Sequence, residues 1–415
     1  MSPVTTEKRG SAPAAPAGGG GGPGGALAGA LLAAMRNNMR QYGMLVALGL
    51  IVVVFQVWSD GTLLLPRNVS NIVQQNSYIL ILAMGMMIVI IAGHIDLSVG
   101  SLCAFASAMS AVMMVNHDFP WPLALTCSLL IGAVAGAWQG FWIAYVGIPS
   151  FIVTLAGMLV FRGLTQIVLE GQSLAPFPKG FQNIAQGFLP ETGPETNYHN
   201  LTLLLGIAIG LFLLWQEWRD RRRQLSYELD VLPYPLWLAK CAFIVAAVVV
   251  ATLMLASYRG VPVVLLIMAG LLISLSYVMR NVVVGRHVYA LGGNKAAATL
   301  SGVKDKRVTF LVFVNMGVLA ALAGCVYAAR LNAGVPKAGE MFELEAIAAA
   351  FIGGASMSGG IGTVFGAIIG GLVLGVLNNG MSLVGLGTDY QQVIKGLVLL
   401  AAVGFDIWNK RRAGV

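Results

Sequence analysis

The sequence predicts an all-α, polytopic membrane protein, and three features lead to this fold class. Of its 415 residues, 57% are apolar and only 10% are charged, against roughly 25% charged residues in an average soluble domain. Several apolar runs approach the about 20 residues that a helix needs to cross a bilayer. The basic residues gather in short segments between these runs, as in proteins oriented by the positive-inside rule. The net charge of +8 therefore indicates membrane orientation and not nucleic-acid binding.

The chain divides into a tail and a membrane domain. Residues 1–35 are rich in Gly, Ala and Pro and bury little apolar area, so they predict a disordered cytoplasmic tail. Residues 36–412 form the transmembrane domain. Its first apolar run, 43–58, follows Arg36 and Arg40 and has no small-residue cleavage site after it. This run predicts an uncleaved first span whose N-terminus is cytoplasmic.

The later apolar runs define the topology. They lie at 77–93, 98–115, 121–146, 150–169, 201–217, 236–256, 261–279, 307–329, 342–378 and 391–408. The RDRRR run at 219–223 marks the cytoplasmic side most strongly. Counting the spans outward from this run places both termini in the cytoplasm on one condition, which is that 342–378 enters and leaves the membrane on the same side. Its halves, 343–354 and 363–378, are each short for a full span and are separated by GGASMSGGIG. We expect a re-entrant or broken helix pair here, beside about ten spans.

A comparable break, GHIDLSVGS at 93–101, interrupts the first half of the chain. Two Gly-interrupted apolar segments, one in each half, are typical of a transport pathway. Asp96 in the first break has two interpretations. Asp96 and Ser98 suit the N-cap of a helix that begins near Leu97, whereas an ionisable residue at membrane depth also suits a gate or substrate contact.

Other polar residues in apolar surroundings also have two interpretations. Arg162 lies about 18 Å along the span that begins at Ser150, where it either pairs with carbonyl groups or lines the path. Amide side chains either bridge helices or bind sugar hydroxyls. The pathway or gate candidates are Asp96, Ser98, Arg162, Ser356, Ser358, Asn378 and Asn379.

The loop from 280 to 306 is too polar to span and predicts one short cytoplasmic helix. The helix covers Lys295 to Leu300, is entered through Gly292-Gly293-Asn294 and ends at Ser301-Gly302. It is either an ordinary interfacial helix or a segment seated in a groove of a partner. The chain has no Gly-Lys dipeptide and hence no Walker A loop, so ATP, if used, binds another polypeptide. The rival classes are an ion-coupled secondary carrier and a passive channel.

Five motifs in order resemble a known family: AGHIDLSVGS (92–101), IPSFIVTLAGMLVFRG (148–163), YALGGNKAAATLSG (289–302), FIGGASMSGGIGTVFGA (351–367) and NNGMS (378–382). They are similar to the permease subunits of ribose/xylose-type bacterial ABC sugar importers, and the resemblance covers roughly residues 36–412. The branch that handles several monosaccharides (xylose, glucose, galactose and arabinose) is the most similar one, because it carries an insertion like that near 201–256.

The resemblance implies a role, partners and a location. The chain would be a transport subunit of the inner membrane, not an enzyme, importing monosaccharides by alternating access. It would hold no cofactor, with ATP and Mg on a separate ATPase. Its partners would be a second copy of itself, the cytoplasmic ABC ATPase, a periplasmic sugar-binding protein and the lipid bilayer, with no nucleic acid. The residues that couple to the ATPase would be Arg286, Gly292, Gly293, Asn294, Ala297, Ala298, Ser301 and Gly302.

Overall fold

The computed structural model describes residues 39–192, 194, 197–229 and 231–413, so the predicted disordered tail 1–35 lies outside the described residues. Within them the regular structure is helical, apart from two isolated β-bridges that join Leu174 to Gly334 and Phe188 to Pro262. The predicted all-α class is confirmed.

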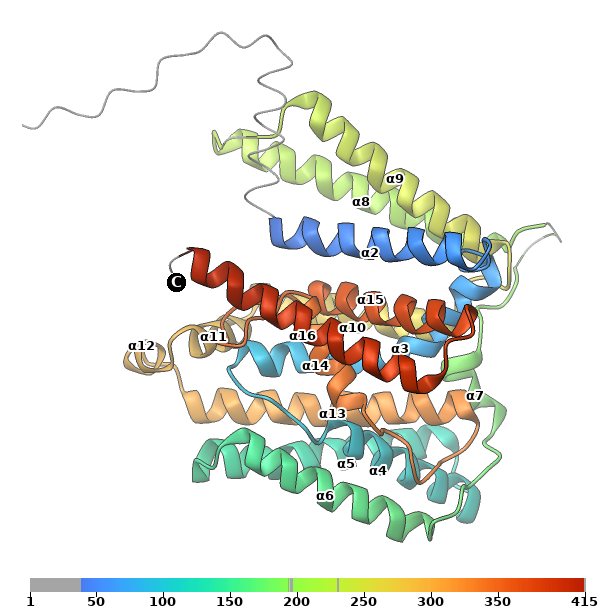
Figure 1. The fold of residues 1–415 in the computed structure, drawn as a ribbon, viewed down its shortest axis with the longest axis vertical. Helices are drawn as coiled ribbons and strands as arrows, with labels where there is room; N and C mark the ends of the chain where they lie inside the picture. The colour runs from blue at the N-terminus through green and yellow to red at the C-terminus, as the bar shows by residue number, and fades with distance from the viewer. Residues whose placement is uncertain (1–38, 193, 195–196, 230, 414–415) are drawn as a thin grey trace, which may run out of the picture.

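Nine helices in the described part of the chain are long and apolar enough to cross a membrane. They are α3 (Pro66–Ile91), α4 (Val99–Ala111) with its π-helical extension η1 (Val112–Asn116), α5 (Trp121–Phe141) with η2 (Trp142–Val146), α6 (Ser150–Leu169), α8 (Asn200–Ser226), α9 (Tyr234–Ala256), α10 (Val263–Asn281), α13 (Asp305–Leu331) and α15 (Val364–Leu383). The first and last described helices, α2 (Met39–Trp58) and α16 (Thr388–Ala413), run alongside them (Figure 1). A polytopic helical membrane protein is therefore what the chain forms.

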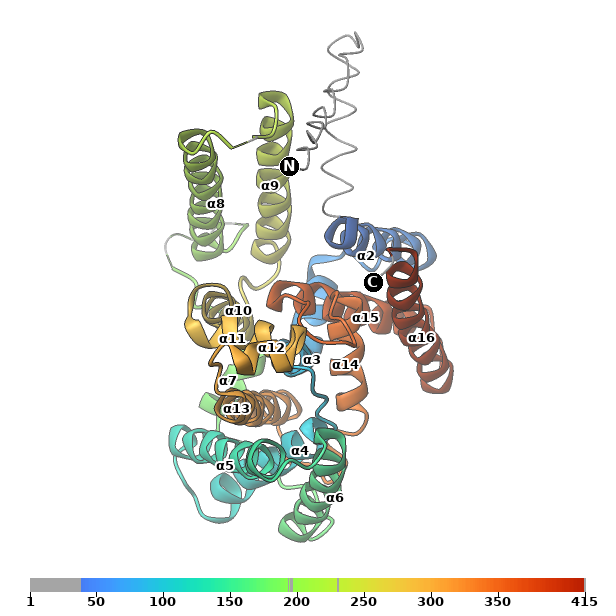
Figure 2. The same ribbon diagram turned by 90° about the vertical axis from the view of Figure 1, so that its left-hand side faces the viewer.

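The core of the bundle surrounds α3. Of the most apolar part of α3, 83% is buried, against 11% for α8 and 6% for α9. Helices α13, α14 (Phe342–Ile352) and α15 all pack on α3, whereas the α8–α9 pair stands apart at one edge of the molecule (Figures 1 and 2). The centre of the bundle is thus a protein interior, and the α8–α9 pair exposes most of its apolar surface.

The short helices mark the two ends of the bundle. Helices α11 (Val283–Gly293) and α12 (Lys295–Leu300) lie at the end where α2 begins and α16 finishes, and α7 (Lys179–Gln186) lies at the other (Figure 1). The start of α2, the end of α16 and the loop 280–306 therefore share one side of the bundle (Figure 1). That this side is the cytoplasm remains a prediction.

Small residues let the central helices approach closely. Gly136 of α5 faces the backbone of α13, where a Cβ atom would come within 3.0 Å of the carbonyl carbon of Phe313. In α15, an added Cβ at Gly370 would meet the backbone nitrogen of Gly353 at 2.5 Å. Such contacts replace the hydrophobic driving force that helices lack inside a membrane, so the glycines of α15 serve helix packing.

The expected hairpin at 342–378 needs one correction. Its first half, α14, has 11 residues and is indeed short, but the second half extends through Asn378 and Met381 to form α15, a 20-residue helix long enough to span. Polar Asn378 and Asn379 do not end the helix, because its interior backbone bonds are satisfied within the helix and Asn379 finds a side-chain partner on α3. The hairpin is therefore one short helix and one helix long enough to span.

Candidate functional site

The first break places Asp96 before α4 as a turn residue. One carboxylate oxygen of Asp96 accepts hydrogen bonds from the backbone N–H of Ser98 at 2.8 Å and from its hydroxyl at 2.6 Å. Helix α4 begins at Val99, not near Leu97, and Ser98 occupies the N-cap position without a side-chain capping bond. The expected side-chain cap on the helix backbone is therefore wrong in detail. The Asp96 carboxylate accepts from Ser98, and the Ser98 hydroxyl donates to Asp96, so neither side chain bonds to an N–H group of α4 itself. Asp96 fixes the chain immediately before the helix.

The turn connects to a buried polar relay. The side-chain amide of Gln139, on α5, donates to the hydroxyl of Ser98 at 2.6 Å, and that hydroxyl donates to Asp96. All three residues are almost completely buried. Gly157, seven residues or about 10 Å along α6, makes room for them, since a Cβ there would lie 2.6 Å from the Gln139 nitrogen. The relay therefore joins the segment before α4 to α5 and packs on α6.

The start of α14 comes to the same place. The loop before α14 packs on the start of α4, where Gly339 and Gly100 are in backbone contact. An added Cβ at Gly100 would also collide with the carboxylate of Glu343, in the first turn of α14. Arg162 donates to the backbone carbonyl of Ala338 in this loop, which is the carbonyl pairing that the sequence offered as one interpretation. The N-terminal ends of two interrupted helices thus meet beside an acidic and a basic side chain.

A second pair of charges joins α14 to the last helix. Lys395 of α16 donates to the carboxylate of Glu345 at 2.7 Å, with the two side chains only 25% and 19% exposed. Sequence reasoning missed Glu343, Glu345 and Lys395. A signal existed, because all three are ionisable residues within or at the border of apolar runs, where charges are expensive.

The second break lies close to the end of α3. The backbone N–H of Gly360 donates to the carbonyl of Ile91 at 2.9 Å. Ser356 is buried and Ser358 is exposed, and their hydroxyl oxygens lie 2.9 Å apart. Gly359 and Gly360 both have positive φ, +78° and +71°, conformations that favour glycine. The second break therefore contacts the end of α3, two residues before the first break, through the backbone of the same chain.

The loop predicted to couple the transporter contacts the second break and the end of α3, just before the first break. The Gly292 backbone, near the end of α11, packs so closely on Ile91 and Gly360 that no Cβ atom fits there. The hydroxyl of Tyr289 donates to the carbonyl of Gly362 at 2.8 Å, and burial raises its pKa, so it stays protonated as a donor. We name these contacts the glycine junction (Gly292, Gly360 and the carbonyls of Ile91 and Gly362).

Helix α12 begins where the sequence predicted it, at Lys295, and ends at Leu300. The Asn294 side chain caps it by accepting from the N–H of Ala297 at 3.0 Å, and Gly302 follows it in the left-handed region with φ +86°. Ala298 is its buried residue, whereas Arg286, Gly293, Ala297, Ser301 and Gly302 are exposed. Leu300, a residue that sequence reasoning did not single out, is 90% exposed, which suits a helix that docks on a partner.

The asparagines of α15 behave differently from each other. Asn379 and Asn68 of α3 form two reciprocal side-chain hydrogen bonds of 2.8 and 3.1 Å. This geometry is that of a bridge between helices. The side-chain oxygen of Asn378 is buried without a hydrogen-bond partner in the described structure.

Comparisons with known proteins agree with these features. A family model described as "Branched-chain amino acid transport system / permease component" matches residues 68–403. The xylose transport system permease protein XylH of Haemophilus influenzae is 41% identical over 90% of this chain and 98% of its own length. XylH of Escherichia coli is 39% identical over 91% and 94%, and the ribose import permease protein RbsC of Haemophilus influenzae is 34% identical over 82% and 84%. No solved structure matches the chain significantly.

Proposed function

The chain belongs to the family of the permease components of branched-chain amino acid transport systems, and on that premise we propose that it is the permease subunit of an ATP-driven monosaccharide importer with xylose as first candidate substrate. It is a multi-pass protein of the bacterial inner membrane. One observation carries the choice of a sugar over an amino acid. The similarity to the xylose permease runs almost from end to end, with 98% of the relative covered.

The proposed assembly has three kinds of protein components. Two copies of this chain enclose the pathway, an ATPase binds at the α11–α12 end, and a secreted sugar-binding protein delivers substrate at the end that carries α7. The exposed Leu300 and the short, capped α12 support docking of the ATPase there. ATP and Mg belong to the ATPase.

The glycine junction is the proposed coupling element. Helix α12 has only six residues, and Asn294 alone separates it from α11. A displacement of α12 therefore moves the end of α11. Gly292 then pushes on the end of α3 and on Gly360 together. Packed backbones transmit such shifts with little loss, because close-packed interiors have low compressibility. ATPase motion would thereby reach both breaks at once.

The pathway is proposed to pass the point where α4 and α14 begin. Asp96 and Ser98 hold the start of α4, while Arg162 holds the loop before α14. We assign Asp96 to positioning. Asp96→Asn keeps an oxygen acceptor for Ser98, so the expected outcome is retained uptake with a stability loss of about 1 kcal/mol. Abolished uptake at unchanged stability would instead assign Asp96 to the gate.

The function is tested by uptake in the bacterium that carries this chain. Deleting the gene for this chain should abolish uptake of labelled xylose and spare uptake of labelled leucine. Expressing the chain again should restore xylose uptake. The uptake should survive an uncoupler while ATP is maintained. Loss of leucine uptake alone would favour an amino-acid substrate, collapse with the uncoupler would favour an ion-coupled carrier, and flux through the reconstituted subunit alone would favour a channel.

A further inference from the structure

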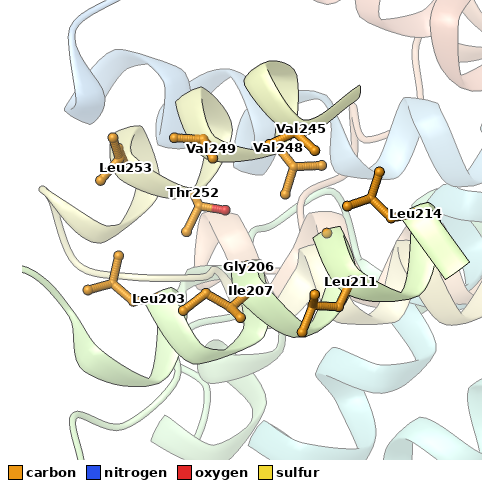
Figure 3. Close-up of a pocket in the computed structure, with 11 residues that line it drawn as sticks. Leu203, Gly206, Ile207, Leu211, Leu214, Val245, Val248, Val249, Thr252 and Leu253 are labelled. Atoms are coloured by element: carbon orange, nitrogen blue, oxygen red, sulfur yellow. The ribbon is translucent and has the colours of Figure 1, made fainter. Parts of the chain in front are cut away.

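The α8–α9 pair presents an apolar groove to its surroundings. Its volume is about 350 Å³, and every side chain that lines it is apolar except that of Thr252. Leu211 and Leu214 line it from α8, and Val249 and Leu253 line it from α9 (Figure 3). Leu211, Val249 and Leu253 are 64%, 47% and 43% exposed. The groove is therefore open at its outer side, toward the hydrocarbon core of the bilayer.

The face of α8 that lines the groove continues into a polar end. Trp218 and Arg221 follow Leu214 by four and seven residues, the spacings that share one helix face. Trp residues concentrate where membrane and water meet, and Trp215, Trp218 and Trp237 all lie at this end of the pair. The groove thus runs inward from the interface.

In the described structure the arginines at this end keep most of their N–H groups unbonded, although Arg221 donates through Nη1 to the carbonyl oxygen of Leu232 at 2.8 Å. Arg222 lies 3.8 Å over the ring of Trp218, Arg221 lies 5.1 Å over Trp237, and Arg219 lies 4.7 Å over Trp215. Stacking engages the face of a guanidinium group, so its N–H groups remain available in the plane for a carboxylate or phosphate.

The local acidic groups do not neutralise this cluster. Glu217 is already bonded to Lys240 at 2.7 Å, and Asp220 lies 3.9 Å from Arg219. Within the described residues, the Nε of Arg219 and the indole N–H of Trp237 are buried without an acceptor. Two unpaired donors beside stacked guanidinium groups point to a missing anionic acceptor.

We propose that this region binds an anionic phospholipid of the cytoplasmic leaflet, with its phosphate on Arg221 and Arg222 and one acyl chain in the α8–α9 groove. The dimensions agree. Leu211 lies ten residues from Arg221, or about 15 Å, which is the hydrocarbon thickness of one leaflet. The lipid would fill the groove of the helix pair that packs least on the rest of the protein.

Native mass spectrometry of the full chain in neutral detergent tests the site with dioleoyl phosphatidylglycerol and dioleoyl phosphatidylcholine. Wild type should retain one phosphatidylglycerol at least about tenfold more tightly than phosphatidylcholine. The Arg221→Gln/Arg222→Gln variant should lose this preference. Gly210→Trp should also lose it by filling the groove, because a Cβ at Gly210 meets only Val248, at 3.7 Å.

Two matched controls complete the test. Arg259→Gln removes an arginine at the opposite end of the pair, and Leu204→Trp adds a ring to an exposed position of α8 outside the groove. Both should bind phosphatidylglycerol like wild type. Gly210→Leu replaces Gly210→Trp if size-exclusion chromatography shows the latter misfolded. Equal binding of the two lipids, or loss in the arginine variant without loss in the groove variant, would overturn the proposal.

Discussion

The substitution Gly292→Ala would test whether the glycine junction couples α12 to the two breaks. The new methyl group would lie 2.5 Å from the backbone nitrogen of Gly360 and 2.9 Å from the carbonyl carbon of Ile91. The carbonyl oxygen of Ile91 would lie closer still. Non-bonded atoms prefer 3.5–4.0 Å, so the junction must open by more than about 1 Å. Overpacking of this kind costs about 1–3 kcal/mol.

That free energy would bias one conformation of the junction over another. A bias of about 1–3 kcal/mol between two states changes a coupled equilibrium about 5- to 150-fold. We therefore expect uptake of labelled substrate to fall by at least about fivefold, while the ATPase still co-purifies, because Leu300 and the outer face of α12 are unchanged.

The neighbouring residue offers a matched control. A Cβ at Gly293 has nothing within 4 Å, so Gly293→Ala should change stability by no more than about 1 kcal/mol and leave uptake intact. Uptake and ATPase activity would be measured for both variants in reconstituted vesicles, with thermal stability measured on the purified subunit. Equal uptake by the two variants would refute the coupling role of the junction.

Three further changes have expected outcomes. Ser98→Ala should destabilise the subunit by about 1–3 kcal/mol in thermal unfolding, because it leaves the buried amide of Gln139 without its acceptor. Lys395→Met should cost about 1–2 kcal/mol by stranding the half-buried Glu345, and the exchange of the two charges should recover part of it. Leu300→Ser should change stability by less than about 0.5 kcal/mol, since the side chain is 90% exposed, yet should reduce co-purification of the ATPase.

Each of these has a control and a contrary result. Ser101→Ala removes a hydroxyl that donates only to the backbone carbonyl of Ser98 at 2.8 Å and leaves the bonds of the relay in place, and an equal loss there would argue against the relay. If the Lys395→Met variant unfolds at the same temperature as wild type, the ion pair does not contribute to the stability of the subunit. Thr299→Ala is the control on α12, and undiminished ATPase binding by Leu300→Ser would exclude that side chain from the interface.

The sequence located the two helix breaks but not all of the charged and apolar residues that the structure places around them. Asp96 and Arg162 were found because a charge inside an apolar run is conspicuous. Glu343, Glu345 and Lys395 carry the same signal, but they stand at the borders of their runs. Leu300 gave no sequence signal, because an apolar residue in a short helix is as often buried as exposed.

The sequence by itself determined that this chain is a helical membrane protein, where its helices break and how α12 is capped, because these depend on local hydrophobicity, glycine and cap chemistry. Only the tertiary structure decided that Gly292 contacts the end of α3 and the second break together, and that Gln139 completes the relay with Ser98 and Asp96. These contacts join segments far apart in the chain, and their geometry follows from how whole helices pack, which local composition does not specify.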